Sequence, residues 1–223
     1  MELNFLGRKL PRIIIKYGKV LDPIFIFYCQ NNPDLKTRGW NDWVLPTQEE
    51  MFKRVANYRK EWSKYETKIL KGIYAVLNLK FKRNIIDVYI VSGNPRQLSA
   101  PIVIKSGFSP DEFIDSLTHE LIHALFQDNG KKIPMSIFDE MFPEETESTK
   151  SHVVVHSILK YIYIDILKDE KMLERNIENS KKHSTNDYLR AWEIVEEEGY
   201  IEIIRKFKNK IKKGYQFSDN PFN

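Results

Sequence analysis

The chain of 223 residues contains a single cysteine, Cys29, and five histidines. One cysteine excludes an internal disulfide framework and a cysteine-rich zinc module. No run of about 18 apolar residues occurs, so no membrane-spanning helix is expected. The N-terminus also lacks the pattern of a secretory signal, because its apolar stretch is short. We therefore expect a soluble, cytoplasmic protein with no membrane partner.

The composition nevertheless supports a folded core. Hydrophobic residues make up 42% of the chain, which excludes wholesale disorder. The net charge of +4 is a mild surplus and indicates no particular partner. The length fits one domain over residues 1–223, in which 1–46 is a candidate N-terminal extension of strands and loop.

Local patterns predict an α+β fold. The β-rich runs 12–17 and 24–28 predict two strands or a loose hairpin. Apolar residues at helical spacing predict one long helix over 47–79, which begins with a capping box of Thr47 and Glu50 and has a break near Gly72. The remaining patterns predict a loop at 30–46, strands at 85–91 and 101–105, and helices at 109–127, 145–168, 169–181 and 187–212.

The helix predicted over 109–127 carries the motif His119-Glu120-Leu121-Ile122-His123. Residues four apart lie one turn above each other, so both imidazoles project from one helix face and can bind one zinc ion. The intervening Glu120 can then act as general base toward a zinc-activated water. Ser109 as N-cap, with Glu112 three residues later, supports this helix assignment.

The sequence resembles the zincin metallopeptidases at His119, Glu120 and His123. Zincins have a long backing helix, a sheet that ends in an edge strand, the H-E-x-x-H helix and a later helix with a third ligand. The predicted elements follow that order at 47–79, 85–91, 101–105, 109–127 and 145–168. The resemblance implies a zincin-like fold, a zinc cofactor, a peptide or protein substrate, and a substrate-binding edge strand at 101–105.

The third metal ligand is left open by the sequence. The metzincin continuation is absent, because Leu125-Phe126-Gln127-Asp128 follows the motif. Gluzincins place a glutamate on the later helix, where this chain offers His152 and His156, four residues apart. We favour His156 slightly, because it lies deeper in the apolar part of the helix. The acidic alternatives are Glu144, Glu145 and Glu147 as ligands, and Asp139 or Glu140 as a partner that orients a ligand.

Two further features bear on function. The resemblance suggests a downstream histidine or tyrosine that stabilises the oxyanion, and the candidates are Tyr161, Tyr163, His183 and Tyr188. The basic run Arg205–Lys213 is typical of a solvated helix end more than of a nucleic-acid surface, so we expect no nucleic-acid partner.

The leading hypothesis is a zinc metallopeptidase in which Glu120 activates water. One alternative is a non-catalytic zinc-binding or peptide-binding regulatory module, in which both His152 and His156 close the coordination shell. Another is a DNA-associated zincin protease, which the basic C-terminal run weakly favours.

Overall fold

The computed structural model describes residues 10–32, 44–93, 97–182 and 185–218, with side chains as far as residue 212. The chain divides into two compact units. The sheet unit comprises residues 1–67 and 83–124, and the helical unit comprises residues 68–82 and 125–223. The predicted α+β class is confirmed, because helices accompany a small mixed sheet. That the chain forms a single domain stays a prediction.

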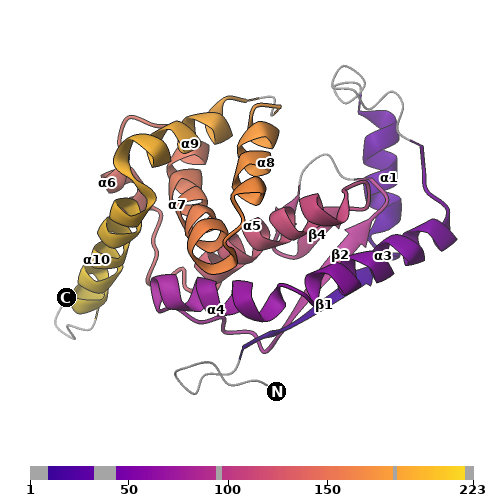
Figure 1. The fold of residues 1–223 in the computed structure, drawn as a ribbon, viewed down its shortest axis with the longest axis horizontal. Helices are drawn as coiled ribbons and strands as arrows, with labels where there is room; N and C mark the ends of the chain where they lie inside the picture. Colours follow the sequence, from indigo (N-terminus) through magenta and orange to yellow (C-terminus); the bar gives the residue numbers. More distant parts are fainter. Residues whose placement is uncertain (1–9, 33–43, 94–96, 183–184, 219–223) are drawn as a thin grey trace. The chain divides into compact units, whose positions relative to one another are not determined.

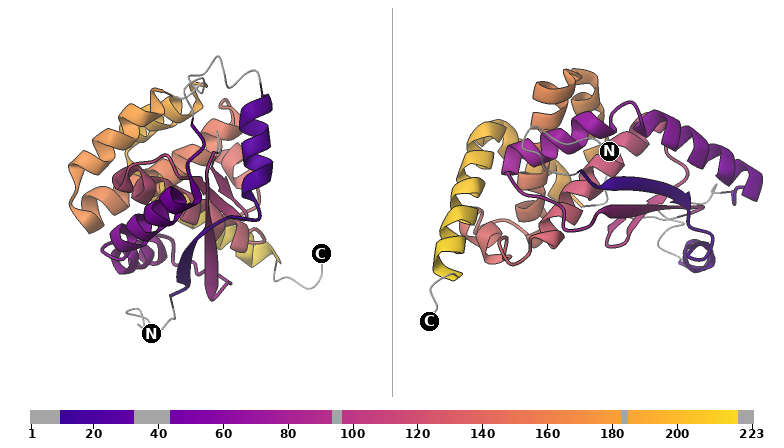
Figure 2. Two further views of the ribbon diagram at one scale, coloured as in Figure 1. Left: turned by 90° about the vertical axis from the view of Figure 1, so that its right-hand side faces the viewer. Right: turned by 90° about the horizontal axis from the view of Figure 1, so that it is seen from below.

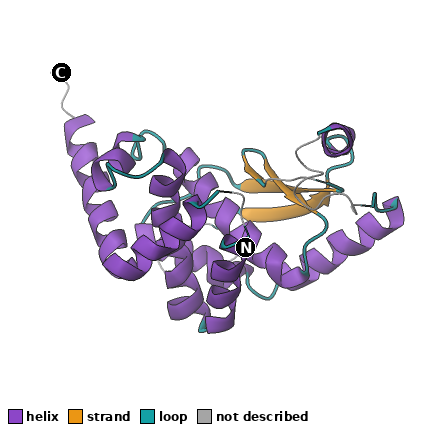
Figure 3. Ribbon diagram, turned by 90° about the horizontal axis from the view of Figure 1, so that it is seen from above, coloured by secondary structure: helices purple, strands orange, loops and turns teal. Residues whose placement is uncertain are grey.

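The sheet has four strands in the order β1-β2-β4-β3, which Figure 3 shows as one group. The strands are β1 (Arg12–Tyr17), β2 (Ile85–Val91), β3 (Leu98–Ser99) and β4 (Ile102–Lys105). β1 and β4 both pair with β2 in parallel, as the adjacent β1 and β2 in Figure 2 illustrate, and β3 pairs with β4 antiparallel. The predicted strands at 12–17, 85–91 and 101–105 are therefore confirmed.

The edge of the sheet differs from the expectation. β4 lies between β2 and β3, so residues 101–105 do not form the edge strand. On that side of the sheet the edge strand is β3, because the segment before β4 folds back and pairs Leu98 with Val103 and Ser99 with Ile102. A two-residue strand is too short to produce a periodic signal in the sequence.

The predicted strand at 24–28 is wrong, because these residues belong to helix α1 (Asp22–Asn31). The buried carboxylate of Asp22 accepts hydrogen bonds of 2.6 Å from the backbone N–H and the hydroxyl of Ser92, and from the hydroxyl of Tyr17. These bonds attach the start of α1 to the end of β2. Since β1 takes β2 as its neighbour, the hairpin that the composition suggested does not form.

The predicted helix over 47–79 is two helices, α3 (Gln48–Trp62) and α4 (Glu66–Leu77). The capping box that begins α3 is confirmed. The break lies at residues 63–65 and not at Gly72, which is buried inside α4. A Cβ on Gly72 would lie 3.1 Å from Cγ1 of Ile166, so glycine permits a close approach there.

Helix α5 (Pro110–Asp128) follows β4 and carries the candidate site. Its predicted start is confirmed: Glu112 N–H donates to the Ser109 hydroxyl at 3.3 Å, and Ser109 N–H donates to the Glu112 carboxylate at 2.8 Å. Tyr58 of α3 stacks on Phe113 of α5 with ring centroids 4.2 Å apart. The Tyr58 hydroxyl also donates to the carbonyl of Phe108 at 2.6 Å, which holds the segment before α5 against α3.

The helical unit contains most of α4 and a bundle in which α7 (Glu147–Tyr161) packs against α9 (Asp187–Glu198) and α10 (Tyr200–Ser218), as in Figure 1. The predicted helix over 145–168 is α7 continued by a π-helix, and the one predicted over 187–212 is divided at Gly199, whose φ is 82°. Its elements after α5 are α6 (Ser136–Met141), α7 (Glu147–Tyr161), the π-helix η1 (Ile162–Leu167), α8 (Glu170–Ser180), α9 (Asp187–Glu198) and α10 (Tyr200–Ser218). None of the helices in the described part of the chain combines the length and apolar character needed to cross a membrane.

Candidate metal centre

The two histidines of the motif face each other on α5. The Nε2 atoms of His119 and His123 lie 3.1 Å apart. Two nitrogens bound to one tetrahedral zinc ion at about 2.0–2.1 Å would lie about 3.3 Å apart. The side-by-side arrangement that the four-residue spacing predicted is confirmed, and its dimensions suit ligands that share one ion.

Glu120, between these histidines, is buried in the sheet unit with 7% of its surface exposed. The hydroxyl of Ser99, on strand β3, donates a 2.5 Å hydrogen bond to its Oε2 atom. Burial raises the pKa of Glu120 to about 7, and the Ser99 bond opposes that rise. Sequence reasoning missed Ser99, because its position follows from the pairing of β3 with β4 and no local motif marks it.

On α7, His152 and His156 are both buried, but their rings have different surroundings. The Nδ1 atom of His152 lies 2.6 Å from the carbonyl oxygen of Ser148, one turn earlier. Because a carbonyl can only accept, Nδ1 carries the proton, and in the neutral ring the lone pair lies on Nε2. His156 stacks on Trp192 of α9, with centroids 4.4 Å apart and an interplanar angle of 16°.

The candidate ligands are the two histidines of α5 and one histidine of α7. His119 and His123 belong to the sheet unit and lie side by side on α5, whereas His152 and His156 belong to the helical unit. The choice between His152 and His156 as the third ligand stays a prediction. Neutral imidazole nitrogens suit zinc, copper, iron and nickel, so the donor set fits a divalent transition metal.

The sequence offered five acidic residues as metal ligands or as partners that orient a ligand, and each has its own surroundings in the structure. Glu144 is exposed. The other four form ion pairs: Glu145 with Arg190 at 3.0 Å, Glu147 with Lys150 at 2.9 Å, Asp139 with Lys150 at 2.8 Å, and Glu140 with Lys210 at 2.6 Å.

Of the candidates for oxyanion stabilisation, Tyr188 lies beside His152 of α7. Its ring centroid is 4.1 Å from that of His152. Tyr163 is fully buried in η1, Tyr161 ends α7, and His183 lies outside the described residues. In the basic run, Arg205 and Lys206 form ion pairs with Glu202 and Glu198.

Comparisons with protein-family models, with curated proteins and with solved structures found no match for this chain.

Proposed function

We propose that this protein is a zinc-dependent hydrolase of the zincin type, and that it cleaves peptide bonds. One observation carries the proposal: a capped helix presents H-E-x-x-H with the histidine Nε2 atoms 3.1 Å apart. Three protein donors are the number at catalytic zinc sites, whereas structural sites use four. The proposed enzyme therefore takes one histidine of α7 as the third ligand, whereas the non-catalytic zinc-binding module would take both.

In this proposal His119, His123 and His152 hold the ion as neutral imidazoles. A zinc ion supplies Lewis-acid chemistry, because it polarises a carbonyl and makes water more acidic. Because His152 Nδ1 donates its proton to the Ser148 carbonyl, the lone pair of Nε2 is available to bind the metal.

Glu120 is the general base and then the general acid. It takes a proton from the attacking water and delivers that proton to the leaving amine. In the metal-free protein burial raises the pKa of this carboxyl group to about 7, and proton transfer is most efficient when the pKa of the catalytic group lies near the operating pH. The Ser99 hydroxyl holds Oε2, so the orientation of the carboxylate is set before substrate arrives.

The position of Ser99 also suggests how a peptide substrate would bind. Ser99 lies on β3, the antiparallel edge strand of the sheet, and its side chain contacts Glu120. An extended peptide that adds to this edge by main-chain hydrogen bonds would lie next to the general base.

The test compares the wild-type protein with the Glu120→Gln variant. After zinc loading we expect about one zinc per chain in both proteins, and hydrolysis of unstructured peptides by the wild type alone, with turnover lowered about 10²–10⁴-fold in the variant. His119→Ala serves as the control that loses both zinc and activity. A Glu120→Gln variant with wild-type turnover would contradict the mechanism. Zinc uptake by the wild type without hydrolysis would instead support the non-catalytic module.

A further inference from the structure

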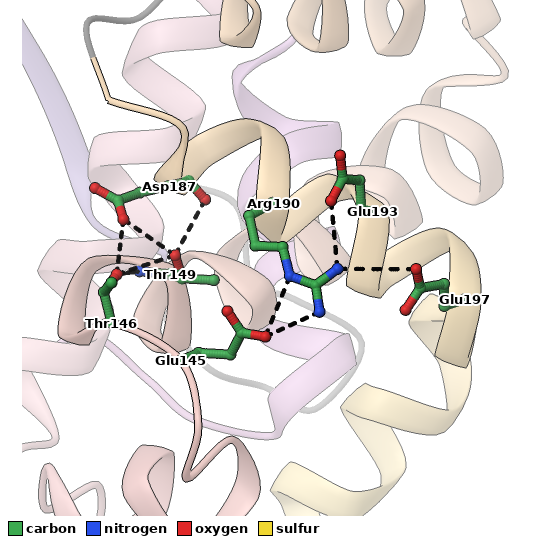
Figure 4. A network of polar contacts seen from close by, with 7 residues as sticks. All are labelled: Glu145, Thr146, Thr149, Asp187, Arg190, Glu193 and Glu197. Carbon is green, nitrogen blue, oxygen red and sulfur yellow. Dashed lines mark hydrogen bonds and ion pairs between the residues drawn. The ribbon is translucent and has the colours of Figure 1, made fainter.

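The first turn of α9 is bonded to the start of α7 (Figure 4). Asp187 Oδ1 accepts hydrogen bonds from the hydroxyls of Thr146, at 2.7 Å, and Thr149, at 3.2 Å. Thr146 is also the N-cap of α7, because its hydroxyl accepts from Thr149 N–H at 3.1 Å. Asp187 therefore ties the start of α9 to the capping residues of α7.

Arg190 makes a second connection between the same segments. Its Nη2 and Nε atoms donate to Oε1 of Glu145 at 3.0 and 3.2 Å, just before the N-cap of α7. The guanidinium also contacts Glu193 and Glu197 of its own helix. Because Asp187 and Arg190 lie within one turn of α9, the two connections together define the position of the residues between them.

Tyr188 is one of those residues, and its ring lies against His152. The two centroids are 4.1 Å apart and the interplanar angle is 40°. At the edge of the imidazole, Nδ1 is bonded to the Ser148 carbonyl at 2.6 Å. The ring of His152 is thus restrained at one nitrogen and on one face.

We propose that Asp187 and Tyr188 are positioning residues for His152, which hold its imidazole in the Nδ1–H tautomer with Nε2 presented as the metal ligand. The inference rests on the proposed metal centre and adds the residues that orient its third ligand. Tyr188 contacts this ligand directly, whereas Asp187 acts through the position of Tyr188; removal of a residue that contacts a ligand and not the metal typically changes metal affinity by about 10- to 100-fold.

This role differs from that of a tyrosine hydroxyl that contacts substrate. A positioning role uses the ring of Tyr188 and is retained in Tyr188→Phe, whereas a substrate-contacting hydroxyl is lost there. Likewise, Asp187→Asn keeps an oxygen that can accept from Thr146 and Thr149, whereas Asp187→Ala does not.

The first measurement is made on metal-free protein labelled with ¹⁵N-histidine. The ring nitrogen signals of His152 are identified by their loss in His152→Ala, with His156→Ala as the control for the neighbouring histidine. We expect the Nδ1–H tautomer in the wild type and in Tyr188→Phe, and averaged tautomers in Tyr188→Ala and Asp187→Ala. An unchanged tautomer in both alanine variants would overturn the proposal.

The second measurement is zinc affinity by competition with a chromophoric chelator. Tyr188→Phe and Asp187→Asn should stay within about threefold of the wild type, and the two alanine variants should bind about 10- to 100-fold more weakly. Glu193→Gln is the matched control, because Glu193 contacts Arg190 and none of the residues that begin α7 in Figure 4. Equal affinities for Tyr188→Ala and the wild type would overturn the proposal.

The test keeps a clear outcome if Tyr188→Ala does not fold or if the wild type binds no zinc. If Tyr188→Ala does not fold, Tyr188→Leu removes the aromatic ring while keeping apolar bulk, and the same loss of affinity is expected. If the wild type takes up no zinc, the proposed function fails, while the tautomer measurement on metal-free protein still decides whether Asp187 and Tyr188 position His152.

Discussion

Among individual side chains, Glu120 is subject to two opposing influences. Its burial disfavours the charged form, whereas the hydrogen bond from Ser99 favours it. Burial is the larger effect, so the pKa is raised from the ordinary value of 4.5 to about 7. In the metal-free protein the carboxyl group is therefore about half protonated at neutral pH.

A pH dependence of stability follows from this shift. Between pH 4.5 and about 7 the folded state binds more protons at Glu120 than the unfolded state does, so the metal-free protein should lose stability as pH rises through that range. A shift of this size corresponds to about 3 kcal/mol. Urea unfolding of chelator-treated wild type and Glu120→Gln at pH 5 and pH 8 measures it, because contributions of other groups cancel between the two proteins. Equal pH dependence in both would contradict the prediction.

The histidines of α7 allow a second prediction. His152→Ala should weaken zinc binding more than His156→Ala, because the bond from His152 Nδ1 to the Ser148 carbonyl leaves Nε2 as a donor, while the ring of His156 stacks on Trp192. Loss of one of three ligands should lower affinity by at least about 100-fold, beyond the effect expected for a residue that only orients a ligand. Zinc titration of both variants checks the ranking, with circular dichroism as the control for folding. The opposite ranking would assign the ligand to His156.

Among the secondary-structure elements, α1 departs furthest from the sequence expectation. Its residues Ile24-Phe25-Ile26-Phe27-Tyr28 have high strand propensity, yet they are helical. Ile24 and Phe27 stay 68% exposed, so packing of these side chains does not explain the helix. The buried bonds of Asp22 to Ser92 hold the first turn of α1 at the end of β2, and the same turn has the acidic residue and the proline that suit a helix start.

The Asp22 contacts should therefore contribute strongly to stability. Asp22→Ala leaves the backbone N–H of Ser92 without its carboxylate partner in a buried position, which should cost about 1–3 kcal/mol. Asp22→Asn retains an accepting oxygen and should cost less. Urea denaturation of both variants measures the difference, and equal costs for alanine and asparagine would show that the hydrogen bonds are not responsible.

For the molecule as a whole, the proposed metal centre would draw on distant parts of the chain, because His119 and His123 belong to α5 and the proposed third ligand His152 belongs to α7. An ion held by all three binds the folded chain in preference to the unfolded one, so metal binding and folding are coupled.

Removal of the proposed zinc ion should consequently lower the melting temperature. At free zinc of 1,000 times Kd, binding adds about 4 kcal/mol, which corresponds to a shift of about 10 °C for a chain of this length. Calorimetry with and without a chelator measures the shift. Glu120→Gln should retain it and His119→Ala should lose it, whereas a shift of equal size in His119→Ala would place the stabilising ion elsewhere.

The helix that carries H-E-x-x-H was predictable because its causes are local. The caps of Ser109 and Glu112 act over three residues, and the approach of His119 to His123 follows from the pitch of one helical turn. Strands β1, β2 and β4 were predictable for a similar reason, since β-branched residues are concentrated in each of them.

Tertiary structure decided the features that depend on long-range pairing. The start of α1 is held by bonds between Asp22 and Ser92, which are 70 residues apart. The contact of Ser99 with Glu120 requires β3 to fold back on β4. Periodicity and propensity describe a residue's own turn or strand, whereas these contacts depend on which distant segment lies beside it, and only the folded chain specifies that.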